Sequence, residues 1–76
     1  MATPKEPHIG HLIKAELARQ ERTVSWLARK LFYSRQNIYR LFESKDISPD
    51  VLMRVSDALE HNFFKYYAEY WDSKNM

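Results

Sequence analysis

The spacing of apolar residues along the chain predicts helices and no strands. Ile9, Leu12, Ile13 and Leu17 recur at intervals of three and four residues, which places them on one face of a helix. We therefore expect a first amphipathic helix over residues 8–20.

A second, short helix is predicted directly afterwards. Thr23 offers a side-chain oxygen to the free amides of a helix start. Val24, Leu27, Ala28 and Leu31 follow at helical spacing and line one face of this helix. A small residue at position 28 lets another helix cross closely.

The segment LFYS interrupts the pattern, and a third helix is predicted after it. Ser34 can cap this helix, and Ile38, Leu41 and Phe42 fall on its buried face. Because only two or three residues separate the second and third helices, they must meet at a sharp angle.

Two more helices complete the predicted fold. Ser48, Pro49 and Asp50 combine a cap, a proline in the first turn and an acid near the positive end of the helix dipole. A fifth helix is expected over the aromatic residues 63–71. The fold class is therefore all-α, a compact five-helix bundle. We expect a flexible arm at 1–7, one domain at 8–71 and a tail at 72–76.

Two short helices joined by a tight turn are the arrangement that presents a helix to the major groove of DNA. Residues 23–42 resemble the helix-turn-helix of the lambda repressor and Cro superfamily of bacterial regulators. The matching residues are Thr23, Leu27, Ala28, Leu31, Ser34, Ile38 and Leu41. The ending LEHNFFKYYAEY is also similar to a subgroup of short bacterial regulators. The resemblance covers roughly residues 8–71 and implies a lambda repressor-like DNA-binding domain.

Two positions depart from the family pattern. Phe32 stands where the family usually has glycine, and a bulky residue at positive φ costs about 1 to 3 kcal/mol. The turn is therefore either strained or different in geometry. Val24 stands where the family often has a glutamine that binds a phosphate, although the free amides of the helix start remain.

The distribution of charge favours a polyanionic partner. Residues 22–42 hold five basic residues and no acidic one, whereas the rest of the chain holds seven basic and ten acidic residues. The net charge of +2 hides this asymmetry. Carboxylates in this segment would oppose binding to phosphates, so their exclusion fits a surface that faces DNA.

The outward side of the third helix supplies the candidate base-reading residues. Gln36 and Arg40 point most directly outward, and Asn37 and Tyr39 flank them. Glutamine suits adenine and arginine suits guanine, each through two hydrogen bonds. The candidate phosphate-binding residues are Thr23, Arg29, Lys30, Ser34 and Arg35.

The aromatic C-terminal helix is the candidate dimer interface. Phe63, Tyr67, Tyr70 and Trp71 fall on one helical stripe, which could instead simply cover the core. The family resemblance implies pairing through this helix, and a two-fold dimer would place two recognition helices about 34 Å apart. We therefore expect a homodimer.

The sequence is also compatible with partners other than DNA. A protein-interaction module that uses Trp26 and the aromatic C-terminal helix is the main alternative, because Trp26 lies off the predicted buried face. RNA is a third candidate, although no sheet is expected on which aromatic residues could stack bases.

Catalysis and cofactor binding are not expected. A chain of 76 residues leaves little room for an enclosed active site. His8 and His11 alone make an incomplete metal site, and there is no cysteine and no glycine-rich phosphate loop. We predict no enzyme activity, cofactor, small-molecule ligand or membrane contact. The sequence fits a soluble cytoplasmic protein.

Overall fold

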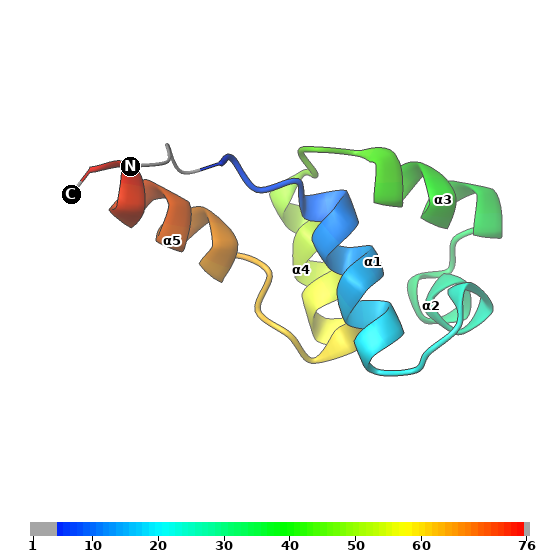
Figure 1. The fold of residues 1–76 in the computed structure, drawn as a ribbon. Helices are drawn as coiled ribbons and strands as arrows, with labels where there is room; N and C mark the ends of the chain where they lie inside the picture. Colours follow the sequence, from blue (N-terminus) through cyan, green and yellow to red (C-terminus); the bar gives the residue numbers. More distant parts are fainter. Residues whose placement is uncertain (1–4, 76) are drawn as a thin grey trace.

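The computed structural model describes residues 5–75, which form five helices and no strand. The helices are α1 (Ile9–Arg19), α2 (Val24–Leu31), α3 (Arg35–Glu43), α4 (Pro49–Leu59) and α5 (Lys65–Lys74). In Figure 1, α1 to α4 form one body, and α5 lies beside it at the end of an extended linker. The all-α prediction with five helices is thus confirmed.

Three of the helices begin where a side chain caps them. His8 Nδ1 accepts a hydrogen bond from the backbone N–H of His11 at the start of α1, and Thr23 and Ser34 cap α2 and α3. The prediction that the Ser48 side chain caps α4 is wrong, although its position is right. Ser48 occupies the N-cap position of α4, but its side chain makes no capping hydrogen bond. Hydrogen bonding to Ser48 instead lowers the pKa of Asp50.

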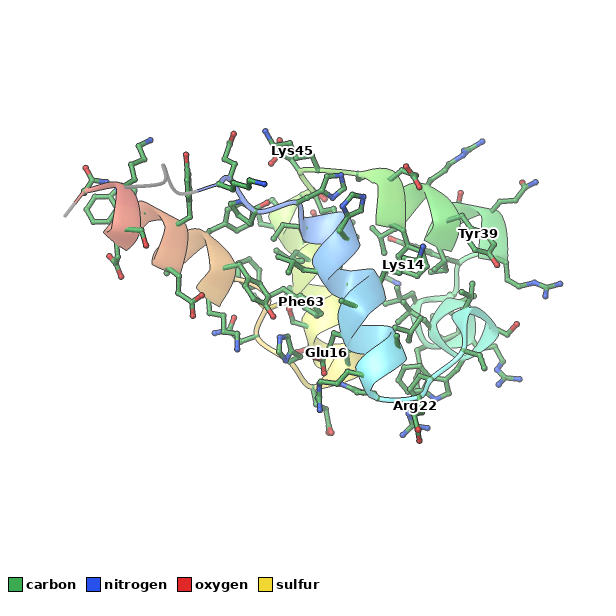
Figure 2. The ribbon with its side chains drawn as sticks, in the orientation of Figure 1. Lys14, Glu16, Arg22, Tyr39, Lys45 and Phe63 are labelled. Carbon is green, nitrogen blue, oxygen red and sulfur yellow. The ribbon has the colours of Figure 1, made fainter. Side chains whose placement is uncertain are left out.

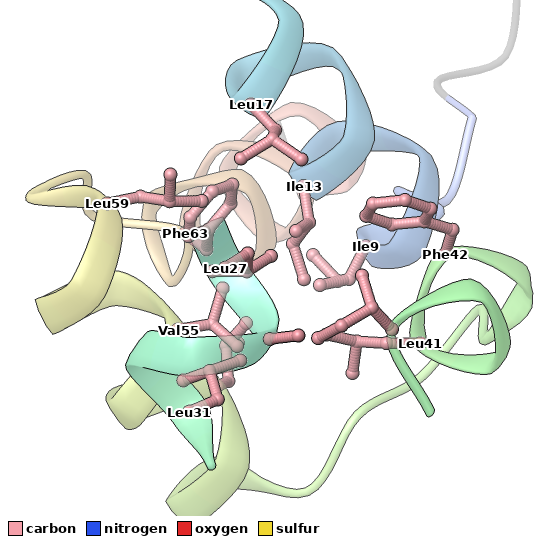
Figure 3. Close-up of a cluster of buried hydrophobic side chains, with 13 residues drawn as sticks. Ile9, Ile13, Leu17, Leu27, Leu31, Leu41, Phe42, Val55, Leu59 and Phe63 are labelled. Carbon is pink, nitrogen blue, oxygen red and sulfur yellow. The ribbon is translucent and has the colours of Figure 1, made fainter. Parts of the chain in front are cut away.

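The hydrophobic core lies where α1 to α4 meet, and Figure 3 shows its side chains converging. Every helix of this body contributes at positions spaced by three or four residues, as the sequence pattern predicts. Full burial of one such aliphatic side chain contributes about 1.5 to 3 kcal/mol. The buried apolar residues are Ile9, Ile13, Leu17, Leu27, Ala28, Leu31, Ile38, Leu41, Phe42, Leu52, Val55, Leu59 and Phe63.

The start of α1 is tied to the end of α3 through the backbone. The N–H of Ile9 donates to the carbonyl oxygen of Lys45 at 3.1 Å, and the N–H of Gly10 donates to that of Ser44 at 3.0 Å. These bonds satisfy two amides at the start of α1 that have no partner within the helix. They also fix α3 against the rest of the body.

A buried carboxylate connects α1 to the linker before α5 (Figure 2). Glu16 is only 6% exposed and accepts hydrogen bonds from Arg19 Nε at 2.9 Å and Gln20 Nε2 at 2.6 Å. The bond from Arg19 is the largest cause that lowers the pKa of Glu16 to about 2. His61 Nδ1 lies 3.7 Å from Glu16, and His61 Nε2 lies 2.8 Å from the hydroxyl of Tyr66.

The last helix differs from its prediction. It begins at Lys65 rather than at Phe63 and continues past Trp71 into the segment that was expected to be a tail. Phe63 precedes the helix and is fully buried in the core, so it cannot present a surface for dimerisation while the body stays folded. In contrast, α5 itself has no buried residue.

The segment that was expected to be a flexible arm is described only from residue 5, and residues 1–4 lie outside the described residues. Glu6 pairs with Lys45 at 2.8 Å. Lys5, Glu6 and Pro7 line the same shallow hollow as Tyr66 and Tyr70 of α5. This part of the chain therefore lies between α5 and the four-helix body.

Candidate nucleic-acid interface

The candidate site is the corner formed by α2, the turn after it and α3, here called the α2–α3 corner (residues 23–43). Thr23 Oγ1 accepts a hydrogen bond from the N–H of Trp26 at 3.0 Å, and Ser34 Oγ accepts one from the N–H of Asn37 at 3.1 Å. Both caps are confirmed. The first amides of α2 and α3 stay free, and such amides at a helix start attract anions.

The turn has the left-handed geometry for which glycine is usual. Phe32 adopts φ 58° and ψ 39°, so the alternative of a different turn geometry is wrong and the strained one is correct. The N–H of Tyr33 donates to the carbonyl oxygen of Ala28 at 2.9 Å and closes the end of α2. Phe32 itself is 90% exposed.

Ala28 and Val24 both face inward on α2. Ala28 is buried in the core, as expected for a position that another helix crosses closely. Val24 is partly buried and packs against the core. Its side chain therefore offers nothing to a phosphate where the family often has glutamine.

The outward positions of α3 agree with the helical-wheel prediction. Ile38, Leu41 and Phe42 are buried. Tyr39 is 55% exposed and packs the edge of its ring against Phe42, with 6.2 Å between the ring centroids, and Figure 2 labels it on α3. The remaining exposed residues of α3 are Arg35, Gln36, Asn37, Arg40 and Glu43. All four candidate base-reading residues thus lie on one solvent-facing helix.

The basic residues of the segment keep their charge available. Within residues 5–75, no carboxylate forms an ion pair with the five basic residues of segment 22–42, which are Arg22, Arg29, Lys30, Arg35 and Arg40. Ion pairs do form elsewhere, at Glu16 and at Glu6. The positive charge of the segment is therefore not neutralised by the part of the chain that the structure describes.

Trp26 has a role that the sequence left open. It is partly buried and packs against the core. The guanidinium of Arg22 lies 4.6 Å from the centroid of its ring, and the ammonium of Lys30 lies 5.7 Å from it. Trp26 thus makes cation–π contacts with one cation on α2, Lys30, and with one that precedes this helix, Arg22.

Sequence reasoning missed Arg54. This residue of α4 donates from Nη2 to the carbonyl oxygen of Leu31 at 2.6 Å, and its guanidinium lies 5.3 Å from the ring of Tyr33. It therefore satisfies a carbonyl at the end of α2 and braces the strained turn. No spacing pattern connects Arg54 to Leu31, so the fold was needed to find this contact.

The two histidines at the start of α1 lie against each other. The rings of His8 and His11 stack with 3.5 Å between their centroids. Among residues 5–75 there is no group of three or more His, Cys, Asp or Glu side chains that could hold a metal ion. In the same range, no helix has the length and apolar character needed to cross a membrane.

The α2–α3 corner thus combines two capped helix starts, a left-handed turn and an exposed basic surface with Glu43, at the end of α3, as its one acidic residue. Comparisons with protein-family models, curated proteins and solved structures found no match to this chain.

Proposed function

We propose that the protein is a sequence-specific DNA-binding transcriptional regulator that places residues 34–43 in the major groove. The observation that carries this proposal is the unpaired positive charge of the α2–α3 corner. Its basic residues are held beside a helix with an exposed polar face, and the ion pairs found among residues 5–75 involve Glu6 and Glu16, which lie outside the corner. A groove lined by phosphates is the partner that this combination of charge and shape fits.

The proposed roles follow from position on the corner. Gln36 and Arg40 read base edges through two-point hydrogen bonds, and Asn37 and Tyr39 contact the bases beside them. The residues proposed for phosphate binding, through side chains or helix-start amides, are Thr23, Arg29, Lys30, Ser34 and Arg35. Glu43 ends α3 and is exposed, so the end of this helix must stay away from the phosphate backbone.

We further propose that two copies pair through α5. No residue of this helix is fully buried in its own chain, and Trp71 is 62% exposed. Tyr67 and Tyr70 are partly buried, and a second copy would cover the rest of their surface. A two-fold pair would present two α3 helices to successive major grooves.

A protein-interaction module remains the second candidate, because the exposed ring of Trp71 on α5 also suits a different protein partner. Trp26 supports this candidate less, since its ring already packs on the core and carries two cations. The two candidates differ in their response to salt. Phosphate binding weakens steeply as salt rises, whereas an aromatic interface does not.

The test is a titration against random-sequence duplex DNA by fluorescence anisotropy at about 50 and about 200 mM salt. The double variant Arg35→Ala/Arg40→Ala should weaken binding and flatten the salt dependence. Lys5→Ala/Lys65→Ala removes the same charge from exposed positions outside the α2–α3 corner and should retain most of the affinity. Absence of binding at low salt, or equal losses in both double variants, would reject the proposal.

A further inference from the structure

Phe32 combines two features that do not stabilise the fold. Its backbone lies in the left-handed region at φ 58°, where a residue with a Cβ atom is strained and glycine is not. Its side chain is 90% exposed, so the ring gains almost no stabilisation from burial. A glycine at this position would relieve both penalties.

An outlier of this kind suggests that the ring has a function. The two other non-glycine residues with positive φ among residues 5–75 are Glu21 and Glu60. Both are charged and exposed, so water solvates their side chains well. Among residues 5–75, Phe32 is therefore the only residue that combines a positive φ with a large apolar side chain exposed to water.

The surroundings of Phe32 indicate the chemistry of its partner. The ring borders a shallow hollow whose other lining residues are Ser25, Ala28, Arg29, Tyr33 and Arg35. Two arginines, two aromatic rings and no carboxylate line it. Arg29 comes from α2 and Arg35 from the start of α3, so the hollow bridges the two helices of the corner.

A partner that fits this hollow must present negative charges on both sides of an apolar surface. The edge of a DNA groove has this arrangement, because phosphates flank the deoxyribose carbons and the thymine methyl groups. An apolar ring between two arginines is therefore complementary to the edge of a duplex.

We propose that Phe32 is a DNA contact that packs against apolar groups of the duplex while Arg29 and Arg35 bind the adjacent phosphates. This inference rests on the proposed DNA-binding function and extends it from α3 to the turn. The strain at Phe32 is then retained because glycine could not make the contact.

The proposal predicts opposite effects on stability and affinity for one substitution. Phe32→Gly should raise the Tm by about 4 to 8 °C and weaken binding to duplex DNA by about tenfold. Glu60→Gly is the matched control, because it removes a similar backbone strain at the end of α4. It should also raise the Tm but should not weaken DNA binding.

The measurements are thermal unfolding by circular dichroism and fluorescence anisotropy with a fixed duplex at about 50 mM salt. A duplex with uracil in place of thymine separates the two apolar sources. Loss of the Phe32 effect on that duplex assigns the contact to thymine methyl groups, and persistence assigns it to deoxyribose.

Three outcomes would overturn the inference. If the unmodified protein binds DNA and Phe32→Gly binds equally well, Phe32 is not a contact and the proposed function still stands. If Phe32→Gly loses more affinity for single-stranded DNA than for duplex DNA, the ring stacks on unpaired bases and does not contact the groove. If the unmodified protein does not bind DNA, this inference and the proposed function fail together.

Discussion

Gly10 and Phe42 are in direct backbone contact: a Cβ atom at Gly10 would lie 2.3 Å from the carbonyl oxygen of Phe42. The next nearest atom is also backbone, because the carbonyl oxygen of Leu41 would lie 2.4 Å away. No side-chain rotation can relieve such a clash. The first turn of α1 can therefore approach the last turn of α3 only through glycine.

We predict that Gly10→Ala destabilises the fold by about 1 to 3 kcal/mol, because either the helices move apart or the backbone distorts. Helix propensity alone would favour alanine by up to about 1 kcal/mol, so the sign of the effect distinguishes the two causes. Urea unfolding measures it. Lys14→Ala, at an exposed position of α1, should change the free energy of unfolding by no more than about 0.5 kcal/mol. A stabilised Gly10→Ala variant would show that α1 and α3 are not in backbone contact.

The buried carboxylate of Glu16 predicts a dependence of stability on pH. Its pKa is lowered to about 2 in the folded protein, from an ordinary value of 4.5. The ionised form is therefore favoured by folding. Its contribution is fully present above about pH 4.5 and is lost as the pH falls towards 2.

We expect Glu16→Gln to be less stable than the unmodified protein at pH 7 by about 1 to 2 kcal/mol. This figure lies below the full linkage value, because Arg19 is largely exposed and water screens the pair. The difference between the two proteins should shrink as the pH falls from 4.5 to 2. Chemical unfolding at several pH values tests this, and a difference that stays constant across this range would contradict it.

The sequence revealed the elements of this fold better than their contacts. Apolar spacing and the caps at Thr23 and Ser34 predicted α2 and α3. Caps and amphipathic faces depend only on residues a few positions apart in the sequence. The turn geometry at Phe32 could be posed as two alternatives but not decided. Arg54, from another helix, donates to the carbonyl oxygen of Leu31 beside this turn, and no local pattern predicts that contact.

The sequence pattern did not predict contacts between distant parts of the chain. Phe63 belongs to an aromatic stripe by spacing. It packs into the core instead, because it lies in the linker that precedes α5 rather than in the helix. The network around Glu16 joins α1 to residues more than 40 positions later. Periodicity within one helix cannot predict either arrangement. The outward residues of α3 were predictable, since the inward direction was fixed by three buried positions.

The proposed dimer predicts that Trp71 is needed for pairing and not for folding. Its side chain is largely exposed in the single chain, so Trp71→Glu should change the free energy of unfolding of the monomer by no more than about 0.5 kcal/mol. The same change should abolish dimers, because it places a charge in an apolar interface. Sedimentation velocity, at the protein concentration used for DNA binding, measures the mass of the unmodified protein and of Trp71→Glu.

Glu69→Lys provides the control for the dimer test, because it changes charge at another exposed position of α5. It should leave the mass unchanged if Glu69 lies outside the interface. A monomeric mass for the unmodified protein under the same conditions would exclude the dimer and leave α5 free for a different partner.

The proposed base readers can be separated from the phosphate binders by what each substitution does to sequence preference. Once a preferred duplex has been selected, Gln36→Ala should lose about 1 to 3 kcal/mol of discrimination at one base pair, because a two-point contact is removed. Lys30→Ala should weaken binding to all duplexes alike and lower the salt slope by about 1. Competition anisotropy with single-base-pair variants of the duplex measures both effects. If Gln36→Ala weakens all sequences equally, α3 contacts the backbone rather than the bases, and sequence recognition must come from another part of the surface.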